Sequence, residues 1–242
     1  RNVTGVQTCA LPIFSWASYG VKRGIYRLLE AFAGHAAKAS VMTSAIIAER
    51  APEAVKAVAD AGHEVLSHSY TMDVIPALLS VEEQKKNIER CSALLEKASG
   101  QKTKGWLSPR GTSGPDLPRL LADAGYSWYG DVFDDDLPYI QDCGGGKKIV
   151  AIPLNTDVND MPFMKYGNPP KSMLEAFEEN LIVACGKPGA AHMIDVTVHA
   201  HIFGRPRGAY YFSKIVERAA AASDVWIATR AEIAGFMLRQ YG

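Results

Sequence analysis

Two apolar runs that end in histidine, separated by most of the chain, constrain the fold of this sequence more than any other feature. The runs are residues 62–70, which contain His68, and residues 195–201, which contain His199 and His201. Apolar and β-branched residues bounded by glycine or polar residues predict strands, so each run delivers an imidazole to one edge of a sheet. Histidine can ligate a metal or transfer protons near neutral pH. We therefore expect a hydrolytic pocket at the mouth of an α/β barrel.

Helical and strand patterns alternate along the rest of the chain, with glycine or proline between them. We expect helices over 21–32, 52–61, 81–100, 115–124, 173–184 and 211–221, and further strands over 39–43, 105–108, 127–130, 149–152 and 225–228. Strands that alternate with helices predict a mainly parallel sheet covered by helices, which is the α/β class. A chain of 242 residues is long enough for one such domain, expected over residues 14–242.

Residues 1–13 show neither a helical nor a strand period and lack an initiating methionine. They resemble the translated read-through of a sequencing adapter, so we expect them to be non-native and leave them out of the fold. A protein that is already under way at Phe14 would lack whatever preceded it, and a signal peptide could have been there.

The composition of the chain limits the classes of binding partner that we expect. Lys+Arg 26 against Asp+Glu 26 gives a net charge of zero with dispersed basic residues, which argues against nucleic acid. No apolar run approaches the ~18 residues of a membrane span, so no membrane association is expected. The four cysteines form no CxxC pair, which favours reduced thiols and the cytoplasm.

The histidines carry both a functional and a structural interpretation. A lone histidine at a strand end is more often a core residue. Serines, a tyrosine and Asp73 surround His68, so we expect His68 to be functional. His63 begins the same strand at its other end, and we expect it to be structural. His199 and His201 share a face if the strand continues through them and diverge if it has ended. His199 is nearer the strand and suits a proton donor, while His201 is placed to support the loop that follows.

Charged side chains follow two other predicted strands. Arg110 lies in a Pro/Gly loop, where a rigid guanidinium can orient a carboxylate or an oxyanion, although a solvated surface arginine is about equally expected. Residues 131–139 contain Asp131, Asp134, Asp135 and a fourth carboxylate. Crowded carboxylates raise one another's pKa and attract a cation, an arginine or a proton, unless the segment is simply a solvated loop.

Residues 62–68, 106–111 and 196–201 resemble the second, third and last motifs of the polysaccharide deacetylase superfamily (NodB homology, carbohydrate esterase 4). Residues 130–139, 155–161 and 224–230 are most similar to its allantoinase-like branch. The resemblance covers nearly all of residues 14–242. It implies a distorted (β/α) barrel and hydrolysis of a non-peptide C–N bond in a small amide, ureide or cyclic imide.

The resemblance also implies roles for single residues. His199 would protonate the leaving nitrogen, Arg110 would hold the substrate, and a lost upstream aspartate, or less readily one of residues 134–136 such as Asp135, would activate water. The expected substrate contacts are His68, Trp106, Asp131, Asp134 and His201.

The sequence departs from the metal-dependent pattern of this superfamily. Where those members have a second histidine four residues after the first, Met72 follows His68, and a thioether is a poor zinc ligand beside oxygen donors. No cofactor is firmly implied, although a divalent metal such as zinc could bind at His68. The aspartates of the first motif should precede Phe14, so we expect the barrel to lack its first strand and the 242-residue chain to be inactive.

Two alternatives stay open at this point. One is an N-acetyl deacetylase of a polysaccharide, against which Met72 counts. The other is a catalytically dead barrel that binds a small molecule or a second copy of itself. Residues 169–170 and 203–211 are candidate contact surfaces for such a homo-oligomer.

Overall fold

The computed structural model describes residues 16–187 and 189–242, and the segment expected to be non-native lies outside them. The chain divides into two compact units. Among the described residues, the first unit comprises 16–37, 155–187, 189–190 and 194–225, and the second comprises 38–154, 191–193 and 226–242. His199 and His201 thus belong to the first unit, whereas His68, Arg110 and Asp131 belong to the second.

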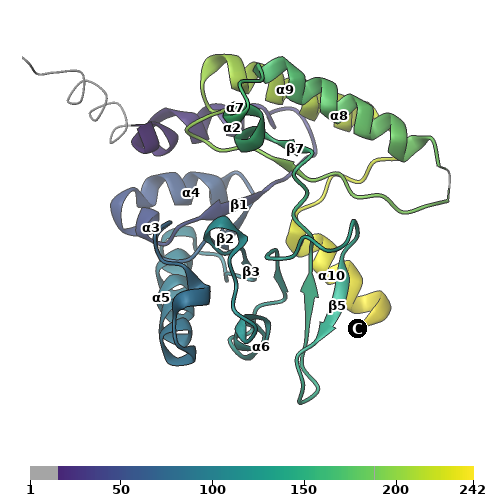
Figure 1. Cartoon of the computed structure of the whole chain (residues 1–242). Helices are drawn as coiled ribbons and strands as arrows, with labels where there is room; N and C mark the ends of the chain where they lie inside the picture. Colours follow the sequence, from purple (N-terminus) through teal and green to yellow (C-terminus); the bar gives the residue numbers. More distant parts are fainter. Residues whose placement is uncertain (1–15, 188) are drawn as a thin grey trace, which may run out of the picture. The chain divides into compact units, whose positions relative to one another are not determined.

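The second unit is built on a six-stranded sheet (Figure 1). Its strands, in spatial order, are β1 (Ser40–Thr43), β2 (Glu64–Ser67), β3 (Gly105–Trp106), β4 (Trp128–Tyr129), β6 (Lys148–Ala151) and β5 (Tyr139–Asp142). The first five are parallel to their neighbours, and only β5 runs antiparallel, against β6. Parallel strands place all their carboxyl ends at one edge, where loops carry functional side chains.

Helices connect these strands. They are α3 (Ile46–Arg50), α4 (Pro52–Asp60), α5 (Val81–Ser99) and α6 (Leu117–Asp123), with 3₁₀ turns η2 (Pro76–Leu78) and η3 (Pro109–Gly111). A further helix of this unit, α10 (Arg230–Tyr241), follows all the strands in the sequence. A capping box begins α5, in which Ser80 and Glu83 satisfy each other's backbone N–H groups. Thr229 and Glu232 do the same for α10.

The core of the second unit lies between the sheet and α10. Leu66, Trp128, Val150 and Ile152 are fully buried against Ala234, and each large apolar side chain so buried contributes about 1.5–3 kcal/mol. Polar contacts tie α10 to the sheet as well. Glu64 accepts hydrogen bonds from Trp128 Nε1 (2.9 Å) and from the backbone N–H of Ala231 (3.1 Å). The buried Arg230 donates to the Ile152 carbonyl (2.9 Å).

The first unit pairs β7 (Val158–Asn159) with β8 (Val196–Thr197) in parallel. Its helical elements are η1 (Gly20–Gly24), α2 (Ile25–Glu30), α7 (Asp160–Lys165), α8 (Pro170–Cys185) and α9 (Pro206–Ala221). Gly24 and Gly204 meet against the Ala200 carbonyl, and a Cβ at Gly24 would lie 1.8 Å from that oxygen. Only glycine allows this approach, which fixes the loop that carries the histidines.

The structure confirms the α/β class and the parallel sheet. Closure into a barrel and a single domain over residues 14–242 stay predictions. The strand expected over 225–228 is wrong, because that segment has no ladder partner and Trp226 is 60% exposed. The antiparallel strand β5, which forms a hairpin with β6 around three glycines, was not expected. Within the residues described, no helix is both long and apolar enough to span a bilayer.

Candidate active-site residues

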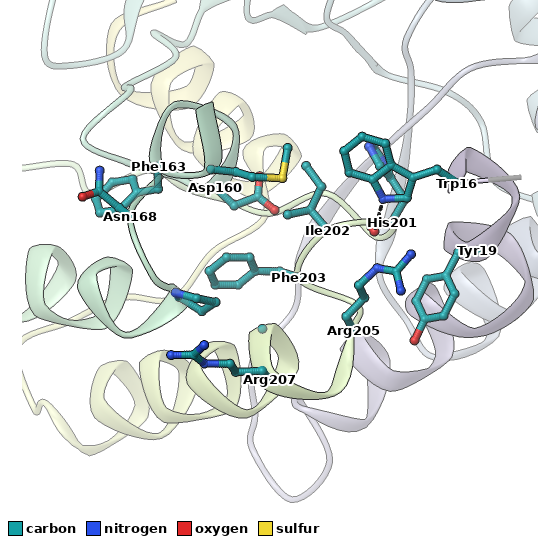
Figure 2. A pocket seen from close by; sticks show the side chains of 13 residues that line it. Trp16, Tyr19, Asp160, Phe163, Asn168, His201, Ile202, Phe203, Arg205 and Arg207 are labelled. Atoms are coloured by element: carbon teal, nitrogen blue, oxygen red, sulfur yellow. Dashed lines mark hydrogen bonds between the residues drawn. The ribbon is translucent and has the colours of Figure 1, made fainter. Parts of the chain in front are cut away.

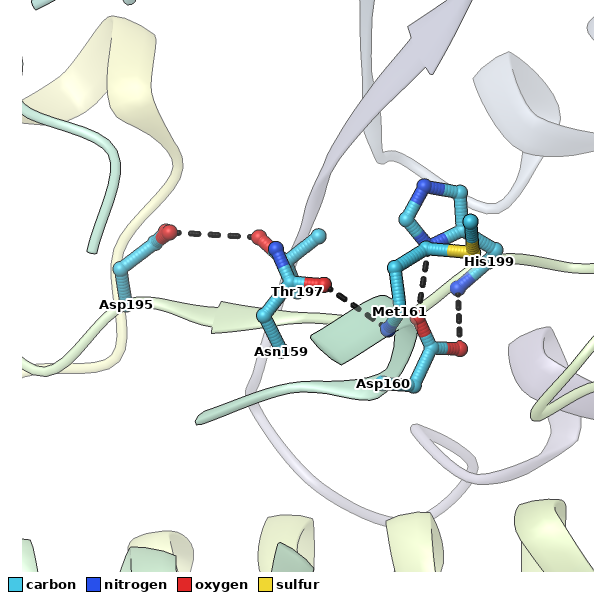
Figure 3. Close-up of polar contacts among 6 residues, drawn as sticks. All are labelled: Asn159, Asp160, Met161, Asp195, Thr197 and His199. Carbon is cyan, nitrogen blue, oxygen red and sulfur yellow. Dashed lines mark hydrogen bonds and ion pairs between the residues drawn. The ribbon is translucent and has the colours of Figure 1, made fainter. Parts of the chain in front are cut away.

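In the first unit, Asp160 and His199 form a paired carboxylate and imidazole (Figure 3). Asp160 follows β7 directly and His199 follows β8, so the parallel pairing of these strands brings them together. Asp160 Oδ2 accepts from the backbone N–H of His199 at 2.7 Å, and Oδ1 lies 2.6 Å from the ring Nδ1. The Asp160 side chain is fully buried and that of His199 is 38% exposed. The carboxylate therefore holds a proton on Nδ1, which makes Nε2 the nitrogen that exchanges protons.

Short polar contacts fix both strand ends beneath this pair. Asn159 Oδ1 accepts from the backbone N–H of Met161 at 3.0 Å and so begins α7. Thr197 Oγ1 donates to Asp195 Oδ2 at 3.2 Å. Asp160 was not assigned to His199 from the sequence. Its signal in the sequence was a carboxylate beside the amide of Asn159, but its partner could not be identified without the strand pairing.

His201 lies beside the pair rather than in it. β8 ends at Thr197, so the chain has left the strand, and the His199 and His201 rings meet edge to face with centroids 5.8 Å apart. Trp16 packs on His201 in the same way at 5.4 Å and donates its indole N–H to the His201 carbonyl. Burial, followed by electrostatic repulsion from the neighbouring His199, lowers the pKa of His201 below its usual value.

A cavity of about 680 Å³ in the first unit adjoins these residues (Figure 2). Its walls include Asp160 and His201, the aromatic rings of Phe163 and Phe203, and the guanidinium-bearing Arg205. This volume is typical of a small-molecule site, and a mainly apolar wall with a few polar groups is the usual composition of one.

In the second unit, His68 lies immediately beyond β2. Its backbone N–H donates to the Thr43 carbonyl (3.0 Å), and its ring Nδ1 lies 2.6 Å from the Leu107 carbonyl on the loop after β3. A contact to a carbonyl requires the proton on Nδ1, so Nε2 is the basic nitrogen of the neutral ring.

Asp131 and Trp106 both hold Ser108 on that same loop. Asp131 Oδ1 accepts from the backbone N–H of Ser108 at 2.6 Å, and Trp106 Nε1 donates to Ser108 Oγ at 2.9 Å. Trp106 is fully buried and Asp131 is 8% exposed. Asp131 Oδ2 is buried without a hydrogen-bond partner, and burial raises the pKa of this carboxyl to about 6. Both residues support the loop, and a direct contact with substrate stays a prediction for each.

The other carboxylates of this segment lie in an exposed turn. Asp135 Oδ1 accepts from the Leu137 backbone N–H at 3.0 Å, and Asp134 accepts from the Tyr139 hydroxyl at 3.1 Å. These are local turn contacts, so the structure adds nothing to the base role expected of Asp135 or the substrate contact expected of Asp134. Both stay predictions.

Backbone strain marks the loops after β2 and β3. Among the described residues other than glycine, only Ser69 (φ 58°) and Arg110 (φ 59°) have positive φ. Each such residue costs on the order of 1–3 kcal/mol and persists only where its surroundings hold it, which is common at functional sites. Ser69 adjoins His68 and accepts from Asn87 Nδ2 at 2.9 Å.

The described residues do not fit a zinc centre. A zinc site needs at least three protein ligands. His68 can supply one, but Met72 is a thioether that is 50% exposed. Across residues 16–187 and 189–242 there is no cluster of three His, Cys, Asp or Glu side chains that could hold a metal ion.

The protein thus belongs to the α/β class. A buried carboxylate–imidazole pair follows β7 and β8, and a strained loop that carries Arg110 follows β3. Comparison with known proteins shows which family this chain is similar to. Residues 19–129 match the family described as Polysaccharide deacetylase. A curated Schizosaccharomyces pombe protein (strain 972), whose name assigns it to the polysaccharide deacetylases, is 26% identical over an alignment of 248 positions, which covers 92% of this chain and 75% of the relative.

Two solved structures are similar to this chain over most of its length. A Pseudomonas aeruginosa PAO1 protein named as a polysaccharide deacetylase is 27% identical, with a TM-score of 0.85 over 94% of this chain and 76% of its own. The Puue allantoinase is 25% identical, with a TM-score of 0.86 over 96% of this chain and 77% of its own. Residues 19–129 therefore match the polysaccharide deacetylase family, and the chain is similar to these proteins over more than nine-tenths of its length. The family match includes His68, Trp106 and Arg110 and ends before Asp131 and His199.

Proposed function

We propose that this protein is a hydrolase of a non-peptide C–N bond in a small amide, ureide or cyclic imide. The observation that carries the proposal is the Asp160–His199 pair, in which a fully buried carboxylate fixes Nδ1 and the backbone of a partly exposed histidine. Hydrolysis of a C–N bond requires a proton for the leaving nitrogen, and a histidine oriented in this way supplies it from Nε2. Likeness to a structure named as an allantoinase supports the ureide class.

The bonds that form and break during hydrolysis determine which groups must donate or accept a proton and which must stabilise charge. Water adds to the carbonyl carbon, the C–N bond breaks, and the nitrogen takes the proton from Nε2 of the His199 imidazolium, which becomes the neutral ring with its proton on Nδ1. The negative charge that develops on the carbonyl oxygen needs a fixed donor, and Arg110 is the proposed one. The proton released by water goes to a base, and Asp135 is the proposed one among the residues of this sequence.

Binding of a divalent cation adds nothing to these steps in the proposal, because the described residues do not make up a three-ligand site. We also propose that His68 binds substrate, because the Leu107 carbonyl fixes its ring through Nδ1. The expectation that His68 and His199 serve one substrate stays a prediction, as do the small-molecule partner and self-association.

The test is hydrolysis of allantoin, succinimide and chitotetraose by the 242-residue chain and by the chain joined to its upstream coding sequence. Ring opening of allantoin or succinimide by the extended chain supports the proposal, and no turnover by the 242-residue chain is expected. Acetate release from chitotetraose alone would establish the polysaccharide deacetylase alternative. Binding of these compounds without turnover would establish the non-enzymatic alternative.

His199→Ala is the decisive variant, and His192→Ala, which removes an exposed histidine, is its matched control. In the extended chain we expect His199→Ala to lower kcat by about 10²–10⁴-fold while His192→Ala leaves it unchanged. Undiminished turnover by His199→Ala would exclude the acid role.

A further inference from the structure

The loop that carries Arg110 is strained and locally closed. It forms the 3₁₀ turn η3, in which Gly111 N–H donates to the Ser108 carbonyl at 3.0 Å and Thr112 N–H to the Pro109 carbonyl at 3.2 Å. Arg110 adopts φ 59° and ψ 19°, the left-handed conformation that a residue with a Cβ avoids. Nothing within this short turn requires an arginine in that conformation.

The segment after β4 supplies the contacts that hold the turn. Asp131 Oδ1 accepts the Ser108 backbone N–H at 2.6 Å, immediately before the turn. The Phe133 ring lies against Gly111 immediately after Arg110, so closely that a Cβ on Gly111 would come within 2.7 Å of it. The turn is therefore fastened on both sides of Arg110 by residues two positions apart.

Asp131 is better buried than a simple turn contact requires. Ser108 N–H needs one acceptor, yet the second carboxyl oxygen is also buried and has no partner. Buried carboxylates are costly unless their oxygens are hydrogen-bonded, so a position that served stability alone would favour an amide or an apolar residue. Strained loops persist where the strain serves a site.

We propose that Asp131 is a positioning residue that, through Ser108, holds Arg110 in its left-handed conformation and so presents the guanidinium to the substrate oxygen. The role given to Arg110 rests on the proposed function. In this arrangement Asp131 acts through the loop, because its Oδ1 accepts from the Ser108 backbone N–H and its Oδ2 is buried.

The test compares Asp131→Ala with Asp131→Asn, since the asparagine keeps an oxygen acceptor for Ser108 N–H and the alanine does not. Crystal structures of both variants should show Arg110 at φ near +60° in Asp131→Asn and at negative φ in Asp131→Ala. An unchanged Arg110 in Asp131→Ala would overturn the proposal. This measurement needs no turnover, so it decides the proposal even if no amide is hydrolysed and the proposed function fails.

Kinetics on the amide that the extended chain hydrolyses give a second, independent measure. We expect Asp131→Ala to raise KM by about tenfold with a smaller change in kcat, and Asp131→Asn to restore KM. The double variant Asp131→Ala/Arg110→Ala should be no worse than Arg110→Ala alone, because Asp131 acts through Arg110. Additive losses would overturn the proposal.

Asp131→Ala could also fail to fold. In that case Arg110→Gly is added, because glycine adopts positive φ without strain. Folding of Asp131→Ala/Arg110→Gly would support the proposal, and failure of this variant as well would show that the fold needs Asp131 whatever residue occupies position 110, which overturns it.

Discussion

Replacing Asp160 by asparagine tests whether the carboxylate sets the protonation of His199. Asparagine is isosteric but offers one acceptor and one donor where aspartate offers two acceptors. The backbone N–H of His199 can only donate, so the amide oxygen must take the 2.7 Å contact. The amide NH₂ then faces Nδ1 across the 2.6 Å contact, and Nδ1 must become an acceptor. The variant therefore forces the neutral ring to carry its proton on Nε2 and opposes the imidazolium.

The magnitude follows from the hydrogen bond that is lost. A hydrogen bond to a charged group is worth about 1.5–3 kcal/mol, which corresponds to a loss of about 10- to 150-fold in kcat/KM. The matched control is Asp157→Asn, which changes an exposed carboxylate three residues away on the same segment. We expect that control to retain the kinetics of the parent chain.

Nitrogen-15 NMR of the histidine rings reads the same change without turnover. The parent chain should show the neutral His199 ring protonated on Nδ1, and Asp160→Asn should show it protonated on Nε2. A ring still protonated on Nδ1 in Asp160→Asn, or full kcat/KM in that variant, would refute the reasoning.

Three other predictions concern strain, burial and thiol reactivity. Arg110→Gly and Arg110→Ala both remove the guanidinium, but only glycine relieves the positive φ, so urea unfolding should find Arg110→Gly more stable by about 1 kcal/mol, and equal stabilities would contradict the strain. The pKa of Asp131 is raised to about 6, so its contribution to stability is present below about pH 4 and is lost as pH rises to about 6. Asp131→Asn does not titrate, and its stability relative to the parent should therefore rise by about 2 kcal/mol from pH 4 to pH 7, whereas a pH-independent difference would contradict the shift. Burial raises the pKa of Cys91 to about 12, so Ellman's reagent should label the exposed Cys185 first and Cys91 only in urea, and rapid native labelling of Cys91 would contradict its burial.

Local signals predicted the elements that local chemistry determines. The capping box at Ser80 predicted the start of α5, and the apolar run before His68 predicted β2. The run over 225–228 failed because apolar periodicity does not say whether a neighbouring strand is present to pair with it, and Trp226 is largely exposed. β5 was missed because its sequence, Tyr-Ile-Gln-Asp, gains a strand conformation only through its ladder with β6.

The candidate site was predicted in part for the same reason. His68, Arg110 and His199 could be chosen because each follows a strand pattern. The partner of His199 could not, since Asp160 lies 39 residues away and meets it only through the pairing of β7 with β8. The strain at Arg110 was equally hidden, because arginine carries no sequence signal for positive φ and only the following Gly111 hints at it.

The buried residues Asp131 and Asp160 both accept a backbone N–H from a neighbouring loop, and they differ in what their second carboxyl oxygen contacts. Each follows one strand of a parallel pair and accepts a backbone N–H from the loop after the partner strand, at 2.6 Å from Ser108 to Asp131 and at 2.7 Å from His199 to Asp160. Because these backbone contacts are equivalent, they cannot distinguish a catalytic pair from a support for a loop. The second oxygen does so. In Asp160 it meets an imidazole nitrogen and controls where a proton resides, whereas in Asp131 it meets no donor within the protein, so we expect Asp131 to act through the backbone that it holds.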